Sequence, residues 1–194
     1  MSEVNEKTPL LEVRNLRKLF AGKSSFFQKD KSWIKAVDDV SFTLNPKETL
    51  GVVGESGCGK STMGRSVLRL IEPTSGEVFF EGKDVAKLSK TEMRHMRKDM
   101  QIIFQDPFSS LNPRKTISQT IAEPLLLNKM VTDKKQLQKK VLELMETVGL
   151  AERLYNTYPH ELDGGRRQRI GIARALSVNP KFIVCDEPVS ALDV

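Results

Sequence analysis

A glycine-rich segment in the first third of the chain carries the pattern of a phosphate-binding loop. The residues Gly54-Glu55-Ser56-Gly57-Cys58-Gly59-Lys60-Ser61 match G-x-x-x-x-G-K-[ST] and lie between an expected strand and an expected helix. Glycines let the backbone turn tightly, so that successive N–H groups point at phosphate oxygens, and the following helix directs its positive end at the same anion. The pattern predicts that Lys60 reaches the β- and γ-phosphates, that Ser61 places a hydroxyl on Mg²⁺, and that Thr62 also donates to phosphate.

Two adjacent carboxylates follow an apolar run near the end of the sequence. Phe182-Ile183-Val184-Cys185 is typical of a strand, and Asp186 and Glu187 come directly after it. Asp186 at a strand end can hold Mg²⁺, usually through water, and Glu187 can orient or deprotonate an attacking water molecule. Strands often end in acidic residues, so the pair gains its meaning from the phosphate-binding loop earlier in the chain.

A second glycine pair, Gly164-Gly165, opens an expected helix whose first turn is basic. This is a second helix start that suits an anion. The alternative is an ordinary loop-to-helix junction with Asp163 as the N-cap, a position that aspartate fills well. A dimer would use both helix starts: the first would bind the chain's own nucleotide, and the second would cover the nucleotide of the partner chain.

The composition fits one folded domain. The chain has 194 residues, of which 39% are hydrophobic and 29% charged, and no apolar run approaches the roughly 18 residues of a membrane helix. The polar N-terminus lacks the pattern of a secretory signal, and two cysteines fit a reducing cytosol better than a disulfide scaffold. The net charge is +6, but the basic residues are spread along the chain, so we expect no nucleic-acid partner.

Strand and helix signals alternate along the chain, which predicts an α/β fold with a mainly parallel sheet. Strands are expected at 10–14, 36–44, 49–53, 77–80, 101–104 and 181–185. From residue 105 to about 162 the pattern shows helices and turns but no strand, and one apolar helix stripe is formed by Leu137, Val141, Leu144, Met145 and Val148. This section is interpreted as a helical insertion between two strands of one sheet.

The order of these motifs resembles that in the ATPase subunits of ABC transporters. Within that family the chain most resembles the oligopeptide/dipeptide importer branch (OppF/DppF-like). The segments that carry this resemblance are 54–65, 105–114, 158–162 and 186–194. The resemblance covers essentially the whole chain. It implies a P-loop NTPase core with an antiparallel β subdomain, at about 1–105 and 163–194, and a helical subdomain inserted between sheet strands at about 106–162.

The resemblance also assigns roles to single residues. Gln105 resembles the Q-loop glutamine, which senses Mg²⁺ and the attacking water, and Asp193 resembles the D-loop aspartate at a dimer interface. The expected catalytic residues are Glu187, Gln105 and Lys60, the expected metal ligands are Ser61, Gln105 and Asp186, and the expected signature for the partner's ATP is Asp163, Gly164, Gly165 and Arg166. Phe20 is favoured over Phe26, Phe27 and Trp33 for stacking on adenine, and a core position for Phe20 is the alternative.

The function implied by the resemblance is ATP hydrolysis, with Mg²⁺, that drives the import of oligopeptides or dipeptides. The implied partners are a second ATPase subunit, identical or different, two membrane permease subunits bound through the helical subdomain and, indirectly, a substrate-binding protein. The chain would then lie on the cytoplasmic face of the membrane. The alternatives are a chain that binds nucleotide without hydrolysis, and a soluble ABC ATPase outside transport.

The signature departs from the family pattern, which has Ser at 163 and Gln at 166. A serine hydroxyl can donate to the partner's γ-phosphate, whereas the Asp163 carboxylate repels it, and Arg166 or Arg167 can offset that charge. We therefore expect the nucleotide site that this motif completes to turn over more slowly than the other site of the dimer.

The end of the sequence also departs from the family pattern. The family continues past the D-loop with a strand that ends at a switch histidine, whereas this sequence ends at Val194, and neither His95 nor His160 takes that position. We therefore expect a C-terminally truncated chain that lacks the last sheet strands, with unpaired backbone groups, low stability and poor ATPase activity.

Overall fold

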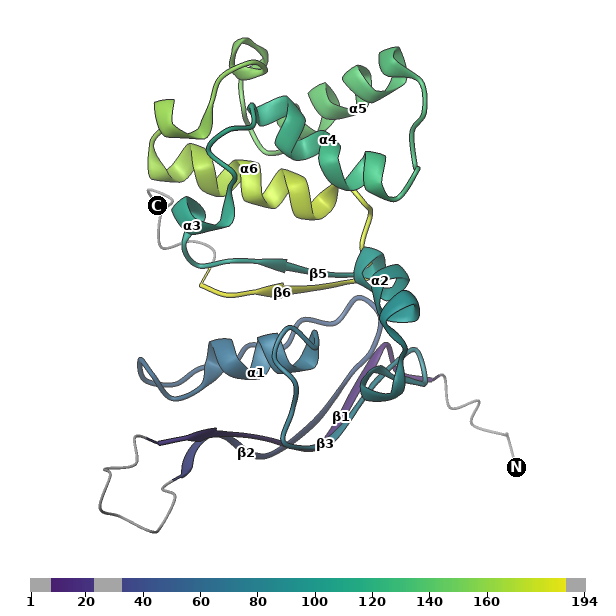
Figure 1. Cartoon of the computed structure of the whole chain (residues 1–194), viewed down its shortest axis with the longest axis vertical. Coiled ribbons are helices and arrows are strands. Elements are labelled where there is room, and N and C mark those ends of the chain that lie inside the picture. Colours follow the sequence, from purple (N-terminus) through teal and green to yellow (C-terminus); the bar gives the residue numbers. More distant parts are fainter. Residues whose placement is uncertain (1–7, 23–32, 188–194) are drawn as a thin grey trace. The chain divides into compact units, whose positions relative to one another are not determined.

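The computed structural model describes residues 8–22 and 33–187 (Figure 1). Its internal contacts divide the chain into two compact units, Met1–Arg94 and His95–Val194. The chain passes from one to the other within helix α2 (Lys90–Asp99).

The first unit is built on a four-stranded antiparallel sheet with the order β2-β1-β3-β4. Its strands are β1 (Leu11–Ala21), β2 (Trp33–Leu44), β3 (Ser75–Phe80) and β4 (Lys83–Asp84), and its helices are α1 (Lys60–Val67) and the 3-10 turn η1 (Val85–Lys87). Helix α1 lies against β1 and β2 (Figure 1). Apolar residues on one face of the strands form the core of the unit, among them Leu11, Leu16 and Phe80, which are fully buried.

The second unit pairs two parallel strands with a helical layer. Strand β5 (Met100–Ile103) lies beside β6 (Phe182–Cys185), and the helices are α3 (Pro107–Ser110), α4 (Ile117–Leu127), α5 (Lys134–Thr147), the 3-10 turns η2 (Glu152–Leu154) and η3 (Pro159–Glu161), and α6 (Gly164–Leu176). Helices α4 and α5 contact α6 (Figure 1). Their apolar faces share one cluster centred on Ile117, Ile121, Val141 and Ile170, which are all fully buried.

Polar side chains fix where the helices of the second unit begin. Thr116 and Gln119 form a reciprocal capping box at the start of α4, and the Asp133 carboxylate accepts the backbone N–H of Gln136 at the start of α5. Within α5, Val141, Leu144 and Met145 are buried as the apolar stripe predicts. The expectation of helices and turns without strands from 105 to 162 is confirmed.

Two expectations about the sheet are wrong. The segment 49–53 is not a strand, and Val53 is 93% exposed, because no strand among the described residues pairs with its backbone. A mainly parallel sheet is not found either, since parallel pairing in the described ranges is confined to β5 and β6, whereas the antiparallel β subdomain implied by the resemblance is confirmed by the four-stranded sheet. In the section β2-β1-β3, the central strand β1 pairs antiparallel with the next strand in the chain, β2, and with the more distant β3. No helix within 8–22 and 33–187 is long and apolar enough to cross a bilayer.

The core of the second unit allows a matched test with two leucines on one helix. Leu125 is 1% exposed and Leu127 is 63% exposed, both near the end of α4. We expect Leu125→Ala to lower the free energy of unfolding by about 2–5 kcal/mol, because it leaves a cavity, and Leu127→Ala to change it by less than about 0.5 kcal/mol. Urea unfolding followed by circular dichroism measures both, and equal effects would contradict the packing described here.

Candidate nucleotide site

The phosphate-binding loop is closed by the side chain of its own lysine. The Lys60 ammonium donates to the backbone carbonyl oxygens of Gly54 at 2.7 Å and Glu55 at 2.8 Å, and lies 4.0 Å from the Cys58 sulfur. These bonds hold the cation over the loop, where the sequence pattern places the β- and γ-phosphates. The loop therefore has its charge in place before any anion arrives.

The first turn of α1 is left open to an anion. Its N-cap, Gly59, has a φ of +99° and no side chain that caps the helix, and the first turn holds no acidic residue. Backbone N–H groups at a helix start lack intrahelical acceptors, and the helix dipole adds positive potential there. A Cβ at Gly59 would lie 1.9 Å from the carbonyl oxygen of Ala36, so only glycine fits this position.

A second group of predicted residues meets where β5 and β6 end. The strands finish side by side at Ile103 and Cys185, and the backbone N–H of Asp186 donates to the carbonyl oxygen of Ile103 at 2.9 Å. Beyond this point the Gln105 amide nitrogen donates to the Glu187 carboxylate at 2.5 Å. The structure thus brings together the expected sensor glutamine and the expected general base, which are 82 positions apart in sequence.

The donors expected for Mg²⁺ fit a hard divalent cation in their chemistry. Asp186 supplies a carboxylate, Ser61 a hydroxyl, and Gln105 an amide oxygen, since its nitrogen is the atom bonded to Glu187. Mg²⁺ usually takes one or two protein ligands together with phosphate and water. The described ranges contain no group of three or more His, Cys, Asp or Glu side chains that could hold a metal ion together.

The start of α6 differs from the start of α1. The Asp163 carboxylate caps α6 by accepting the backbone N–H of Arg166 at 2.8 Å, and its other oxygen lies 3.4 Å from the Arg166 guanidinium. The N-cap alternative for Asp163 is therefore what the structure shows, and Arg166 is the arginine that offsets its charge. The carboxylate already takes one of the N–H groups that an anion at this helix start would use.

Three side chains of α6 contact the segment around Gln105. The sequence did not predict these contacts. The Arg167 guanidinium lies 3.9 Å from the centre of the Phe108 ring, the buried Gln168 amide donates to the carbonyl oxygen of Phe104, and Arg174 donates to that of Ser110. No local pattern in the sequence signals these contacts. The sequence singled out Arg167 only as part of a basic first turn and, with Arg166, as a residue that can offset the charge of Asp163.

The remaining predicted site residues have simpler positions. Phe20, in β1, is 39% exposed, so it is not a core residue, and the Lys18 ammonium lies 4.9 Å from its ring centre. Trp33, at the start of β2, is 56% exposed. Asp193, Phe26 and Phe27 lie outside the described residues. The loop at 54–61 belongs to the first unit, and Gln105, the α6 start and Asp186-Glu187 belong to the second.

Hydrogen bonding and burial shift two pKa values near the end of the parallel strands. The backbone N–H of Phe108 donates to the Asp106 carboxylate at 2.8 Å and lowers the pKa of Asp106, which keeps the cap of α3 ionised. Partial burial raises the pKa of the Cys185 thiol. Cys185 is therefore a neutral side chain beside Asp186 at neutral pH.

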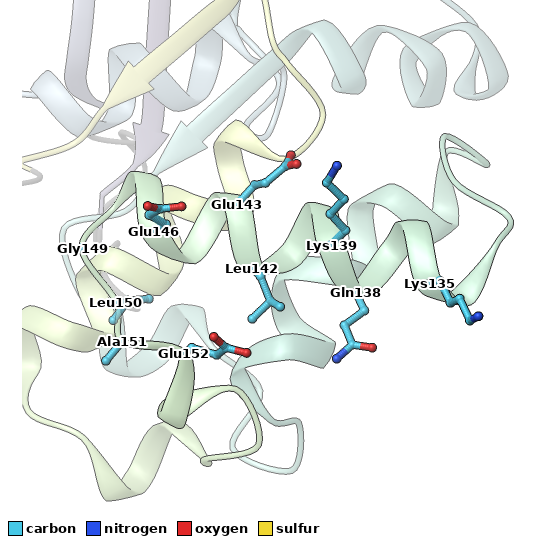
Figure 2. A pocket seen from close by; sticks show the side chains of 10 residues that line it. All are labelled: Lys135, Gln138, Lys139, Leu142, Glu143, Glu146, Gly149, Leu150, Ala151 and Glu152. Atoms are coloured by element: carbon cyan, nitrogen blue, oxygen red, sulfur yellow. The ribbon is translucent and has the colours of Figure 1, made fainter.

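The helical layer also contains an open groove of about 800 Å³ (Figure 2). It is lined by one side of α5 and by residues 149–152, and Gln138, Leu142 and Glu152 point into it (Figure 2). Lysines and glutamates both border it, and it has no glycine-rich loop.

The chain matches a known family model and several named proteins. The model described as "ABC transporter" matches residues 37–190. The oligopeptide transport ATP-binding protein AppF of Bacillus subtilis is 52% identical over 195 residues, covering 100% of this chain and 59% of AppF. The dipeptide transport ATP-binding protein DppF of Haemophilus influenzae is 48% identical, covering 100% of this chain and 58% of DppF. The chain thus spans a little under three fifths of these relatives.

Solved structures have the same fold. The ATP-binding cassette MJ0796, in a dimeric post-hydrolysis state bound to ADP and Pi, superposes with a TM-score of 0.84 at 31% identity, covering 94% of this chain and 76% of that chain. The protein cbiO1 from Clostridium perfringens, part of an ABC transporter complex, superposes with a TM-score of 0.74 at 25% identity, covering 96% of this chain and 68% of that chain.

The tight fit at Gly59 gives a test of the loop with a glycine control. Gly59→Ala forces a Cβ against the Ala36 carbonyl at a positive φ, so we expect nucleotide affinity to fall at least about fivefold from strain of ~1–3 kcal/mol. A Cβ at Gly51 would meet no atom within 4 Å, so Gly51→Ala should leave affinity unchanged. Calorimetric titration with MgATP measures both, and equal affinities for the two variants would refute the fit.

Proposed function

Because this chain belongs to the ABC transporter family, we propose that it binds and hydrolyses ATP, and that this activity drives peptide import through membrane partners. The observation that carries the proposal is the loop in which the Lys60 ammonium is held over Gly54 and Glu55, followed by the uncapped first turn of α1. The relatives named as oligopeptide and dipeptide transport ATP-binding proteins support the choice of nucleotide and cargo class.

We assign ATP binding to the side chains and backbone groups that the sequence predicted. The loop residues from Gly54 to Thr62 bind the phosphates through backbone N–H groups and the Lys60 ammonium, and Phe20 offers one ring face to adenine. Lys18 lies over the Phe20 ring. Ser61, Gln105 and Asp186 would hold Mg²⁺, which would neutralise charge on the phosphate oxygens.

Hydrolysis is assigned to Glu187 and Gln105. A water oxygen attacks the γ-phosphorus, one water proton passes to the Glu187 carboxylate, and the bond to the β-phosphate oxygen breaks so that ADP leaves with the electron pair. The hydrogen bond from Gln105 orients Glu187 and leaves the amide oxygen of Gln105 for the metal. Asp163 to Arg166 act on the nucleotide of a second ATPase subunit, with Asp193 at the shared interface.

The partners proposed are those of a transport ATPase. The dimeric cassette MJ0796 supports pairing with a second ATPase subunit. The groove along α5 supports docking of permease subunits on the helical layer, and a substrate-binding protein acts indirectly (Figure 2). This assembly places the chain on the cytoplasmic face of the membrane.

A second candidate function is nucleotide binding without hydrolysis. It is favoured by one observation, the Asp163 carboxylate that already caps α6 where the partner's γ-phosphate would bind. A carboxylate cannot donate to phosphate and repels it. The two candidates differ in the effect of removing the Glu187 carboxylate.

The Glu187→Gln variant distinguishes the two functions. Glutamine keeps the shape and a hydrogen bond to Gln105 but cannot accept a proton, so we expect phosphate release to fall at least about 100-fold while ATP stays bound. Phosphate release and ATP retention on a filter measure both, with Glu77→Gln on the exposed face of β3 as control. ATP binding that depends on Lys60 without turnover in the parent chain would establish the binding-only function.

The charge of Asp163 gives a further prediction with a matched cap. Two unit charges about 4 Å apart in water repel by about 1 kcal/mol, and Arg166 offsets part of the Asp163 charge, so we expect Asp163→Ser to raise turnover by up to about fivefold. Serine still caps the helix, so stability should hold. Asp133→Ser makes the same exchange at the cap of α5 and should leave turnover unchanged. Steady-state phosphate release measures both, and no increase for Asp163→Ser contradicts the role of its charge.

A further inference from the structure

Helix α6 holds the segment that contains Gln105 through three side chains. Gln168 donates to the carbonyl oxygen of Phe104 at 3.3 Å, Arg174 donates to that of Ser110 at 2.7 Å, and Arg167 lies over the Phe108 ring. These contacts bracket Gln105 on both sides. Helix α3, which carries Phe108, lies beside the N-terminal end of α6 (Figure 1).

Arg167 differs from the other two because it joins three segments at once. Its Nε donates to the carbonyl oxygen of Pro159 at 2.7 Å, its Nη2 donates to that of His160 at 3.3 Å, and its flat face lies 3.9 Å from the centre of the Phe108 ring. A planar guanidinium can donate from its edge while its charged face lies over a ring, whereas an ammonium has no flat face and an amide carries no charge.

The contact with Phe108 is not explained by core packing. Phe108 is 62% exposed, whereas Gln168 is 2% exposed and belongs to the interior. An exposed aromatic ring gains little from burial, so the stacked guanidinium is the feature that fixes its place. Phe108 is in turn linked to Gln105. Its backbone N–H donates to the carboxylate of Asp106, which is the residue directly after Gln105.

We propose that Arg167 is a positioning residue that makes the Gln105 segment and the start of α6 move as one piece. Arg167 lies one helical turn after Asp163, and Phe108 lies three residues after Gln105. A displacement of the α6 start, where the partner's nucleotide would bind, is thereby passed to the glutamine that bonds to Glu187. The catalytic consequence rests on the proposed function, but the mechanical link does not.

The link is tested in the full chain by hydrogen exchange without nucleotide. Arg167→Gln removes the stacked cation and one of the two carbonyl bonds, and we expect the backbone amides of 105–110 to exchange about fivefold faster. Arg169→Gln is the matched control, because Arg169 lies on the same helix and donates to the carbonyl oxygens of Val148 and Gly149 instead. It should leave exchange in 105–110 unchanged.

Phe108→Leu tests the same link from the other side and retains both carbonyl bonds of Arg167. We expect it to accelerate exchange in 105–110 as well, and the double variant with Arg167→Gln to add little, because both remove one contact. Should Arg167→Gln not fold, Phe108→Leu carries the test. Unchanged exchange in Phe108→Leu, equal acceleration by Arg169→Gln, or additive effects in the double variant would overturn the proposal.

Turnover provides the readout that a purely structural role would not move. With positioning, Arg167→Gln lowers kcat for ATP about fivefold and leaves KM within about twofold, since the phosphate-binding loop is untouched. A rise in KM with unchanged kcat would contradict positioning. If no variant, the parent chain included, hydrolyses ATP, the proposed function fails, while the exchange experiment still decides the link.

Discussion

The hydrogen bonds from the Lys60 ammonium to the carbonyl oxygens of Gly54 and Glu55 are the interaction on which the proposed site depends. They fold the loop around a cation, and the loop leads into α1 through Gly59, whose left-handed backbone and close approach to Ala36 admit no side chain. The loop therefore presents positive charge and backbone donors without an acid of its own in the first helical turn. An anion with several oxygens is the ligand that such an arrangement favours.

In the second unit, the predicted metal ligand Asp186 and the predicted catalytic residues Gln105 and Glu187 lie where two parallel strands end. The pairing of β5 with β6 places Asp186 beside the end of β5, and this neighbourhood makes the bond between Gln105 and Glu187 possible. Helix α6 then connects the parts of the unit, because its side chains bond to the segment around Gln105, to the turn before α6 and to the end of α5. The two helix starts thus differ: the Asp163 carboxylate caps the start of α6, whereas Gly59 leaves the start of α1 without a side-chain cap.

Local motifs were predictable from the sequence, and distant contacts were not. The phosphate-binding loop, the capped start of α6 and the stripe on α5 depend on neighbours within a few residues, so their residue types alone indicate them. The strand prediction for the apolar segment 49–53 was wrong because a strand needs a pairing partner, and the local sequence pattern does not reveal one. The contact of Gln168 with Phe104 spans 64 positions and leaves no periodic signal, and the role of Gln105 came only from family resemblance.

The loop that contains Lys60 is proposed to recognise the β-phosphate of a nucleotide, and one binding experiment tests this directly. Calorimetric titration of the chain with ATP, ADP and AMP, each with Mg²⁺, separates recognition of the β-phosphate from recognition of the nucleoside. We expect ATP and ADP to bind at least about tenfold more tightly than AMP, because charge-assisted bonds to the β-phosphate are each worth about 1.5–3 kcal/mol. Lys60→Ala should abolish this preference. Equal affinity for AMP and ATP in the parent chain would show that the Lys60 loop does not recognise the β-phosphate.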